Sequence, residues 1–248
     1  MIEVKNISKS FGGQLIVDDI STSFEEGKTN LIIGQSGSGK TVLMKCCIGL
    51  YEVDSGEVVF HGRRFSNLSD KKRRNIRKEM GVLFQGGALF DSLSVEENIM
   101  FPLNMFTKMS LKEKIERVNF VLENVNLSGT NNKFPVELSG GMVKRVAIAR
   151  ALSLMPKYLF ADEPNSGLDP KTAERIDELL SSLTKKFNMT TVINTHDMNS
   201  VLQIGEKICF INQGKLCWEG TKETILKTKK KELNDFVFAT ELTRRIKR

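Results

Sequence analysis

Apolar and polar residues alternate along the chain with two different periods, and together these predict an α/β fold. Residues 1–11 alternate as an edge strand does, and Gly12-Gly13 predicts the turn that follows. Residues 15–28 have the pattern of a second pair of strands. Further strands are expected in the short apolar segments 29–33, 55–65, 81–85, 157–163 and 190–196.

Helical spacing, with apolar residues three and four positions apart, dominates the middle of the chain. Segments 94–106 and 111–127 have this spacing, and Ser110 is a candidate N-cap with Glu113 three residues later. Another helix is expected around 172–186, between the last two predicted strands. A mainly helical insertion therefore interrupts an α/β core.

Composition is that of an ordinary globular protein. The 248 residues are 40% apolar and 27% charged, which is enough for a substantial core in one domain. No segment has the length of a membrane-spanning helix, and the N-terminus has no apolar signal region. We therefore expect the chain on the cytosolic side of the membrane. The four cysteines and two histidines show no zinc-ligand spacing.

The net charge is +7, and the basic residues are concentrated in segments 63–78 and 226–248. Nucleic acid, an anionic membrane surface or acidic loops of a partner would each explain this excess. A solvated helix face explains any single run as well.

The segment GQSGSGKT fits the phosphate-binding pattern G-x-x-x-x-G-K-[ST] at every fixed position. A strand precedes it and a helix follows, so a phosphate would lie at a helix N-terminus, which a merely flexible Gly/Ser loop does not require. Lys40 supplies a positive charge for the β- and γ-phosphates, and the Thr41 hydroxyl is a candidate ligand of Mg²⁺. The residues expected to bind the nucleotide here are Gly34, Gln35, Ser36, Gly37, Ser38, Gly39, Lys40, Thr41 and Val42.

Two acidic residues end the apolar segment 157–163, at the edge where open parallel sheets bind ligands. Asp162 is expected to hold Mg²⁺ with the phosphate loop, and Glu163 to polarise the attacking water as a general base. Gln85, expected at the end of its strand, is a candidate ligand of Mg²⁺ or of that water. His196 is a candidate partner of the γ-phosphate. Surface Asp-Glu pairs are common and a lone histidine is more often structural, so these predictions depend on the accompanying motifs.

A second phosphate site is predicted at LSGGM, residues 138–142, just before an apolar-faced helix. A hydroxyl and backbone N–H groups at a helix N-terminus favour an anion. One protomer has no evident need of two phosphate sites for one nucleotide. The sequence therefore favours a head-to-tail pair in which Ser139, Gly140 and Gly141 of each chain cover the γ-phosphate held by the other.

In this order, the motifs resemble those of ABC-type ATPases, the nucleotide-binding subunits of ATP-binding-cassette transporters, over nearly the full length of the chain. The resemblance implies a single ABC ATPase domain: a P-loop NTPase core with an antiparallel β edge subdomain (1–84 and 156–230), a helical signature subdomain (85–155) and a C-terminal tail (231–248). It also implies ATP and Mg²⁺, a homodimer with two composite sites, transmembrane permease subunits as partners, and a place at the cytoplasmic face of the inner membrane.

The resemblance adds residue roles to those above. Phe11 occupies the place of the aromatic residue that stacks on adenine, where the family more often has tyrosine. Residues 166–169 are similar to the D-loop, with Asp169 as a nucleotide-site residue, and Lys40, Gln85, Glu163 and His196 match the catalytic set. Two positions depart from the common pattern, namely Met142 in place of glutamine and Asn165 in place of threonine.

Residues 83–103 are similar to the ATPase subunits of Mla-type phospholipid transporters, which work with a permease and an MCE-domain protein. In that family the segment faces the coupling helices of the permease, and Gly86, Ala88, Leu89 and Phe90 offer a small apolar surface for one. Alternatively, Leu89 and Phe90 fill the core of the helical subdomain.

Other cargoes and other classes remain as alternatives. Import of amino acids or metal chelates, and release of lipoproteins, would use the same motor. A soluble ABC ATPase acting on nucleic acid or ribosomes is a rival, but those proteins usually carry two cassettes or long insertions that this chain lacks, so no nucleic-acid partner is expected. A P-loop kinase would leave the LSGGM segment unexplained.

The C-terminal tail places Phe236, Val237 and Leu242 at helical spacing before a basic end. The tail is expected to pack on its own domain, to exchange with a dimer mate or to touch the inner leaflet, and the resemblance favours the mate.

Overall fold

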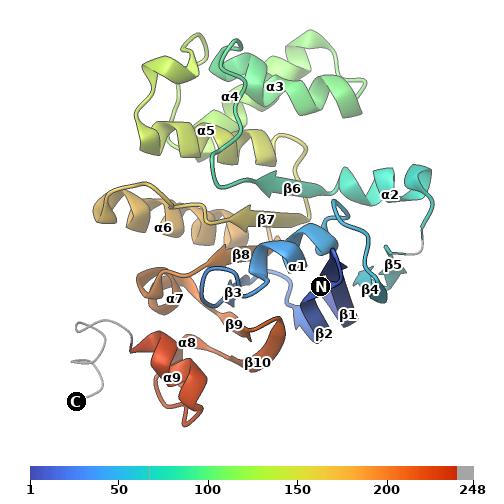
Figure 1. Ribbon diagram of the computed structural model, residues 1–248. Helices are drawn as coiled ribbons and strands as arrows, with labels where there is room; N and C mark the ends of the chain where they lie inside the picture. Colours follow the sequence, from blue (N-terminus) through green and yellow to red (C-terminus); the bar gives the residue numbers. More distant parts are fainter. Residues whose placement is uncertain (67, 239–248) are drawn as a thin grey trace.

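The computed structural model describes residues 1–66 and 68–238, whose strands form two sheets (Figure 1). The smaller sheet is antiparallel and has the order β2-β1-β4-β5. Its strands are β1 (Ile2–Phe11), β2 (Gln14–Phe24), β4 (Ser55–Phe60) and β5 (Arg63–Arg64).

The larger sheet has the order β10-β9-β3-β8-β7-β6, and all of its pairs are parallel except β10 with β9. It contains β3 (Thr29–Ile33), β6 (Met80–Leu83), β7 (Tyr158–Asp162), β8 (Thr190–Thr195), β9 (Lys207–Asn212) and β10 (Lys215–Gly220). The four central strands, β9, β3, β8 and β7, are largely buried and rich in apolar and β-branched residues, as strands covered on both faces are.

Helices cover both faces of the larger sheet (Figure 1). One helix, α1 (Lys40–Cys47), lies between the two sheets and contacts strands of both. The helical insertion contains α3 (Val95–Phe106), α4 (Leu111–Asn124) and α5 (Gly140–Leu152), which pack on one another beyond β6. The other helices are α2 (Asp70–Arg77), η1 (Pro135–Glu137), α6 (Pro170–Lys186), α7 (Met198–Ile204), α8 (Lys222–Ile225) and α9 (Lys231–Val237).

The helix starts follow their sequence signals. Ser110 caps α4 and forms a full capping box with Glu113, as predicted. Ser94 and Glu97 form the same arrangement at the start of α3. Each box satisfies backbone N–H groups that a helix start otherwise leaves unpaired.

Two predictions about the strands need correction. The segment 15–28 contains one strand, β2, which ends at Phe24, and not a pair, and the Asp18-Asp19 step is an irregularity in the pairing of this strand with β1. Asp19 has a φ of 51°, which shifts the register without ending the ladder. The hairpin β9–β10 was not predicted, although Gly214 ends its turn.

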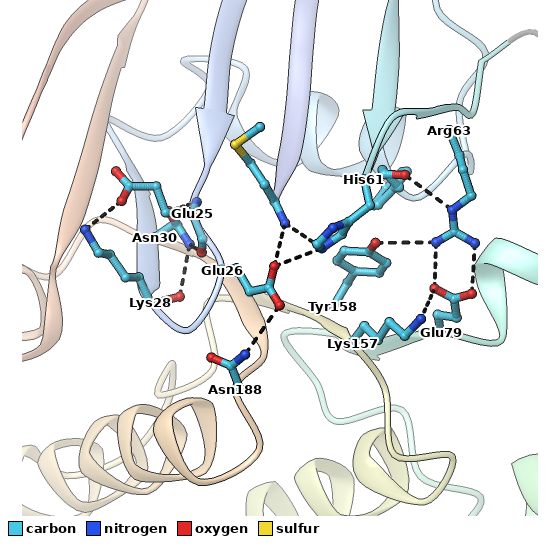
Figure 2. Close-up of polar contacts among 12 residues, drawn as sticks. Glu25, Glu26, Lys28, Asn30, His61, Arg63, Glu79, Lys157, Tyr158 and Asn188 are labelled. Carbon is cyan, nitrogen blue, oxygen red and sulfur yellow. Dashed lines mark hydrogen bonds and ion pairs between the residues drawn. The ribbon is translucent and has the colours of Figure 1, made fainter.

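The two sheets are joined at the amino ends of β6 and β7, far along the strands from their carboxyl ends (Figure 2). The Arg63 guanidinium donates to both carboxylate oxygens of Glu79, at 2.9 and 2.6 Å, and Lys157 pairs with the same carboxylate. The ring of Phe60 packs edge-on against the buried ring of Tyr158, with 4.8 Å between centroids. The sheets also meet elsewhere: Lys207 Nζ on β9 donates to Ser23 Oγ on β2 at 2.9 Å, and the Asp18 N–H donates to the Gly214 carbonyl oxygen at 2.9 Å.

The described part of the tail packs on its own domain. Leu233, Phe236, Val237 and Phe238 are buried in the main core, and the ring of Phe236 lies 5.4 Å from that of Phe210. Of the three expectations for the tail, packing on its own domain is the one that these residues fulfil. Leu242 and the rest of 239–248 lie outside the described residues.

In the part of the chain that the structure describes, none of the helices combines the length and the apolar character needed to cross a membrane.

Candidate functional site

Four loops meet at the carboxyl edge of the larger sheet because β6, β7, β8 and β3 run parallel. The register aligns Leu83 with Ala161, Asp162 with Asn194, and Ile33 with Thr195. At or just after these positions lie the phosphate loop, Gln85, the Asp162-Glu163 pair and His196. The expected convergence of ligand-binding loops is therefore present.

The phosphate loop leads from β3 into α1, as predicted. Its glycines Gly34, Gly37 and Gly39 all have positive φ, and at Gly39, with a φ of 104°, a Cβ would approach the Ile16 carbonyl oxygen to 2.8 Å. The Ser38 hydroxyl is buried and has no hydrogen-bond partner within residues 1–66 and 68–238. The side chain of Val42 packs on the apolar cluster between the sheets, so Val42 offers the nucleotide only its backbone.

The Lys40 ammonium group is folded back onto this loop. It donates to the carbonyl oxygens of Gly34 and Gln35, each at 2.9 Å, and its side chain is buried. Burial lowers its pKa, while the charges of Glu163 and Asp162 act in the opposite direction. A buried cation bonded to carbonyl oxygens fits a site where phosphate oxygens would replace them.

Thr41 and Asp162 form a small oxygen-donor cluster. The Thr41 hydroxyl donates to Asp162 Oδ1 at 3.1 Å, and the amide of Asn194 donates to the same oxygen at 3.0 Å. Mg²⁺ prefers such oxygens and keeps several water or phosphate ligands, so two protein oxygens fit it. Among the described residues, no group of three or more His, Cys, Asp or Glu side chains could hold a metal. Asn194 was not predicted, although a polar residue within a buried apolar strand was a signal for it.

Glu163 and His196 lie in direct contact. His196 Nδ1 is 2.8 Å from Glu163 Oε1, and the Glu163 side chain is 14% exposed against 65% for the histidine. Glu163 has a φ of 50°, a conformation that costs a non-glycine residue about 1 to 3 kcal/mol. Its N–H donates to the Asn194 carbonyl at 3.0 Å. The backbone is thus held in an unfavourable conformation that directs the carboxylate toward His196.

Gln85 lies two residues beyond the end of β6, so the prediction that it ends the strand is wrong. The strand stops at Leu83 because the chain then leaves β7, and Lys144 Nζ takes the Gln85 carbonyl oxygen. The Gln85 amide donates to Ser166 Oγ at 3.2 Å, in the D-loop. Arg150 donates to the Gly87 and Ala88 carbonyl oxygens, both at 2.8 Å. Two side chains of α5 therefore hold the Gln85 loop by its backbone.

The LSGGM segment forms the start of α5. Ser139 is the N-cap, accepting from the Met142 N–H at 3.4 Å, and Ser139 and Gly140 are exposed. A Cβ on Gly141 would meet Thr172 Cγ2 at 2.7 Å, so glycine is needed for the contact with α6. Within residues 1–66 and 68–238, no hydrogen bond joins Ser139–Gly141 to residues 34–41.

Two predicted residues lie at the margins. Phe11 ends β1, is 43% exposed and contacts the ring of Tyr51 edge-on, with 5.0 Å between centroids. The Lys9 ammonium group lies over the same ring, 5.3 Å from its centroid. Asp169 caps α6, accepting from the Thr172 N–H at 3.1 Å, and its carboxylate is exposed. Its interactions at the helix start lower its pKa.

A cleft of about 1450 Å³ opens beside the Glu163–His196 pair. Its wall includes Gln35 and Ser36 of the phosphate loop, the D-loop, and parts of α6 and α7. Asp177, on the same wall, was not predicted. Burial raises its pKa to about 6, an effect to which the nearby Asp197 carboxylate adds, while Ser200 and Asn165 oppose it by hydrogen bonds.

Comparison with known proteins identifies a family and several named relatives of this chain. A model of the ABC transporter family matches residues 17–166. The chain is 36% identical to the methionine import ATP-binding protein MetN of Campylobacter jejuni, over 96% of this chain and 75% of the relative. It is 37% identical to the intermembrane phospholipid transport ATP-binding protein MlaF of Haemophilus influenzae, over 92% of this chain and 86% of the relative.

Among solved structures, the chain is similar to the ATP-binding cassette MJ0796, determined as a dimer in a post-hydrolysis state with ADP and phosphate. The TM-score is 0.80 at 33% identity, covering 90% of this chain and 99% of the other. The expected fold class is therefore confirmed.

The raised pKa of Asp177 makes stability depend on pH. Because the pKa in the folded protein, about 6, lies above the ordinary 3.8, the folded chain binds this proton more tightly than the unfolded chain does. The resulting stability is present below pH 4 and lost as pH rises through 6. We expect Asp177→Asn, which cannot ionise, to be more stable than the native protein by up to about 3 kcal/mol at pH 8 and by little at pH 4.

Urea unfolding at the two pH values measures this difference. Glu178→Gln, at the adjacent exposed position on α6, is the matched control and should stay within about 0.5 kcal/mol of the native protein at both. An equal effect of Asp177→Asn at pH 4 and pH 8 would contradict the raised pKa.

Proposed function

This chain belongs to the ABC transporter family of Mg²⁺-dependent ATPases, and from that premise we propose that it works as a homodimer with two composite ATP sites driving a membrane permease. In each site the phosphate loop of one protomer would bind the nucleotide, and Ser139–Gly141 of the other would cover its γ-phosphate. Phe11 would stack on the adenine, and Asp169 would lie at the junction of the two protomers.

One observation carries this proposal: the two phosphate-binding features of a single chain do not meet. Ser139 and Gly140 are exposed at the start of α5, while Glu163 and His196 line an open cleft of about 1450 Å³. A second copy would close the cleft and bring its serine-glycine segment to the nucleotide. The dimeric form in which the related cassette MJ0796 was solved supports this arrangement.

Each site would hydrolyse ATP by in-line attack of water on the γ-phosphate. Glu163 accepts the proton of that water as a general base. His196, whose Nδ1 lies 2.8 Å from Glu163 Oε1, orients the water and the carboxylate. Lys40 stabilises charge on the transferred group. Thr41, Asp162 and Gln85 would hold Mg²⁺, which neutralises phosphate charge when bound. Loss of the γ-phosphate removes the bridge between protomers, so ATP and ADP favour different states.

Replacing the base should separate ATP binding from hydrolysis. We expect Glu163→Gln to lower the turnover number at least about 100-fold while the protein still binds ATP, because only proton transfer is lost. With ATP and Mg²⁺ this variant should elute as a dimer in size-exclusion chromatography. Adding Ser139→Arg, which places a bulky cation at the γ-phosphate, should return it to a monomer. A Glu163→Gln protein that hydrolyses ATP normally would remove Glu163 from this role, and one that stays monomeric with ATP would refute the composite site.

An apolar surface beside the Gln85 loop is proposed to receive a cytoplasmic helix of the permease. We call the surface formed by Phe84, Phe90, Phe101 and Met105 the docking surface; their exposed fractions are 38%, 42%, 38% and 53%. The rings of Phe90 and Phe101 lie 4.9 Å apart. Leu89, in contrast, packs on the core of the helical subdomain. Of the two expectations for this segment, core packing therefore applies to Leu89, and an exposed apolar surface applies to Phe90. Continuity with the Gln85 loop supports a permease as the occupant.

Making this surface polar should weaken binding of the permease. We expect Phe90→Gln to reduce co-purification with its permease about 10-fold or more, since an aromatic anchor is lost from the interface. Phe120→Gln is the matched control, because Phe120 is 39% exposed on α4, away from the docking surface. Equal recovery of the permease with both variants would place the contact elsewhere. The thermal transition of each purified variant checks that it is folded.

The cargo is proposed to be phospholipid, moved together with an MCE-domain protein. Residues 83–103 and the 37% identity to the phospholipid transport protein MlaF support this. The 36% identity to the methionine import protein MetN favours an amino acid instead. ATPase activity of the complete transporter in nanodiscs distinguishes them: we expect phospholipid to co-purify and free methionine to leave turnover unchanged. Stimulation by methionine would reverse the assignment.

A further inference from the structure

Three buried polar side chains from three different elements meet behind the Glu163–His196 pair. Asn165 comes from the loop after β7, Asp177 from α6 and Ser200 from α7, and their exposed fractions are 8%, 2% and 1%. Asp177 Oδ2 accepts from Asn165 Nδ2 at 3.1 Å and from Ser200 Oγ at 2.6 Å. Asn165 Nδ2 also donates to Ser200 Oγ at 2.9 Å, which closes the cluster.

The chain positions of these residues connect the cluster to the reaction. Asn165 lies two residues after Glu163, and Ser200 lies in the first turn of α7, four residues after His196. The loop that carries the base and the helix that follows the histidine are thus joined twice. One connection is the 2.8 Å contact between Glu163 and His196, and the other is the buried cluster.

The cluster is an unfavourable way to join two elements for stability alone. Among the described residues, Asp177 Oδ1 is buried with no hydrogen-bond partner, and a buried carboxyl group with an unsatisfied oxygen is destabilising. What the carboxyl group supplies is an acceptor with a fixed direction, which the Asn165 amide and the Ser200 hydroxyl both require. Such directional bonds restrict relative movement more than apolar packing does.

We propose that Asp177 is a positioning residue for ATP hydrolysis, which holds the Glu163 loop and α7 in one fixed arrangement so that the base and His196 stay aligned. Asp177 touches neither nucleotide nor reacting atoms; it acts through Asn165 and Ser200. The inference rests on the proposed roles of Glu163 and His196 in hydrolysis. Because the D-loop continues directly from Asn165, the cluster also ties the D-loop to the same unit.

Asp177→Leu tests the proposal, since leucine keeps the branching at Cγ but removes the oxygen that accepts from both Asn165 and Ser200. We expect the turnover number to fall about 10- to 100-fold with the KM for ATP changed less than about 3-fold, because misalignment affects the chemical step while residues 34–41 still bind ATP. Asp177→Asn retains one acceptor oxygen and should restore turnover to within about 3-fold of native.

Thr184→Val is the matched control for loss of a buried polar contact on the same helix. Thr184 Oγ1 donates to the Leu180 carbonyl at 2.7 Å and lies 2.6 Å from Thr191 Oγ1, at the other end of α6. This variant should lose stability while keeping its turnover number. Equal falls in turnover for Thr184→Val and Asp177→Leu would assign a purely structural role to Asp177.

A double-variant cycle separates this inference from the proposed function. In a His196→Ala background, Asp177→Leu should lower turnover by less than about 2-fold further, because alignment with the histidine no longer matters. If Glu163→Gln is inactive but Asp177→Leu turns over normally, the positioning role fails and the proposed function stands. If Glu163→Gln turns over normally, the proposed function itself fails. Should Asp177→Leu not fold, Ser200→Ala removes one bond of the cluster, and an unchanged turnover number in that variant overturns the inference.

Discussion

Parallel pairing of β3, β8, β7 and β6 is the constraint on which the rest of the structure depends. Their register aligns the residues before four loops, so groups more than 150 residues apart in the chain lie within hydrogen-bond distance. The Thr41–Asp162–Asn194 cluster joins β7, β8 and the helix that follows β3 through one carboxylate oxygen. A one-residue slip of β7 would turn Asp162 to the other face of the sheet and break the cluster.

The site contains local features that are unfavourable in free energy, and the surrounding structure holds them in place. Lys40 is buried against carbonyl oxygens, Glu163 has a positive φ, and Asp177 is buried with one oxygen unsatisfied. Each costs free energy that the large apolar cores on both faces of the sheet can offset. Such features are typical of sites where alignment for chemistry takes precedence over stability.

Helix α5 links the serine-glycine segment at its start with α6 and with the Gln85 loop. Its first turn presents Ser139 and Gly140 to solvent, Gly141 lets it approach α6 closely, and Lys144 and Arg150 hold the carbonyl oxygens of the Gln85 loop. The docking surface lies beside that same loop. A rotation of the helical subdomain would therefore move the serine-glycine segment and the Gln85 loop together, which is the physical link between permease and nucleotide that the proposed function needs.

The amino-acid sequence by itself determined the motifs and the local structure around them. The phosphate loop, its flanking strand and helix, and the capping box at Ser110 could be predicted because each depends on residues within a few positions of one another. The prediction of two strands in 15–28 was wrong, since only the pairing with β1 shows that one strand continues past the irregularity at Asp18-Asp19. Asn194 and the Asn165–Asp177–Ser200 cluster were missed for a related reason. The residues that hydrogen-bond here lie 12 to 35 positions apart in the chain, and a lone Asn, Asp or Ser carries no motif. Only the tertiary structure decided which buried polar groups meet, because burial removes water as an alternative partner and makes one arrangement of hydrogen bonds obligatory.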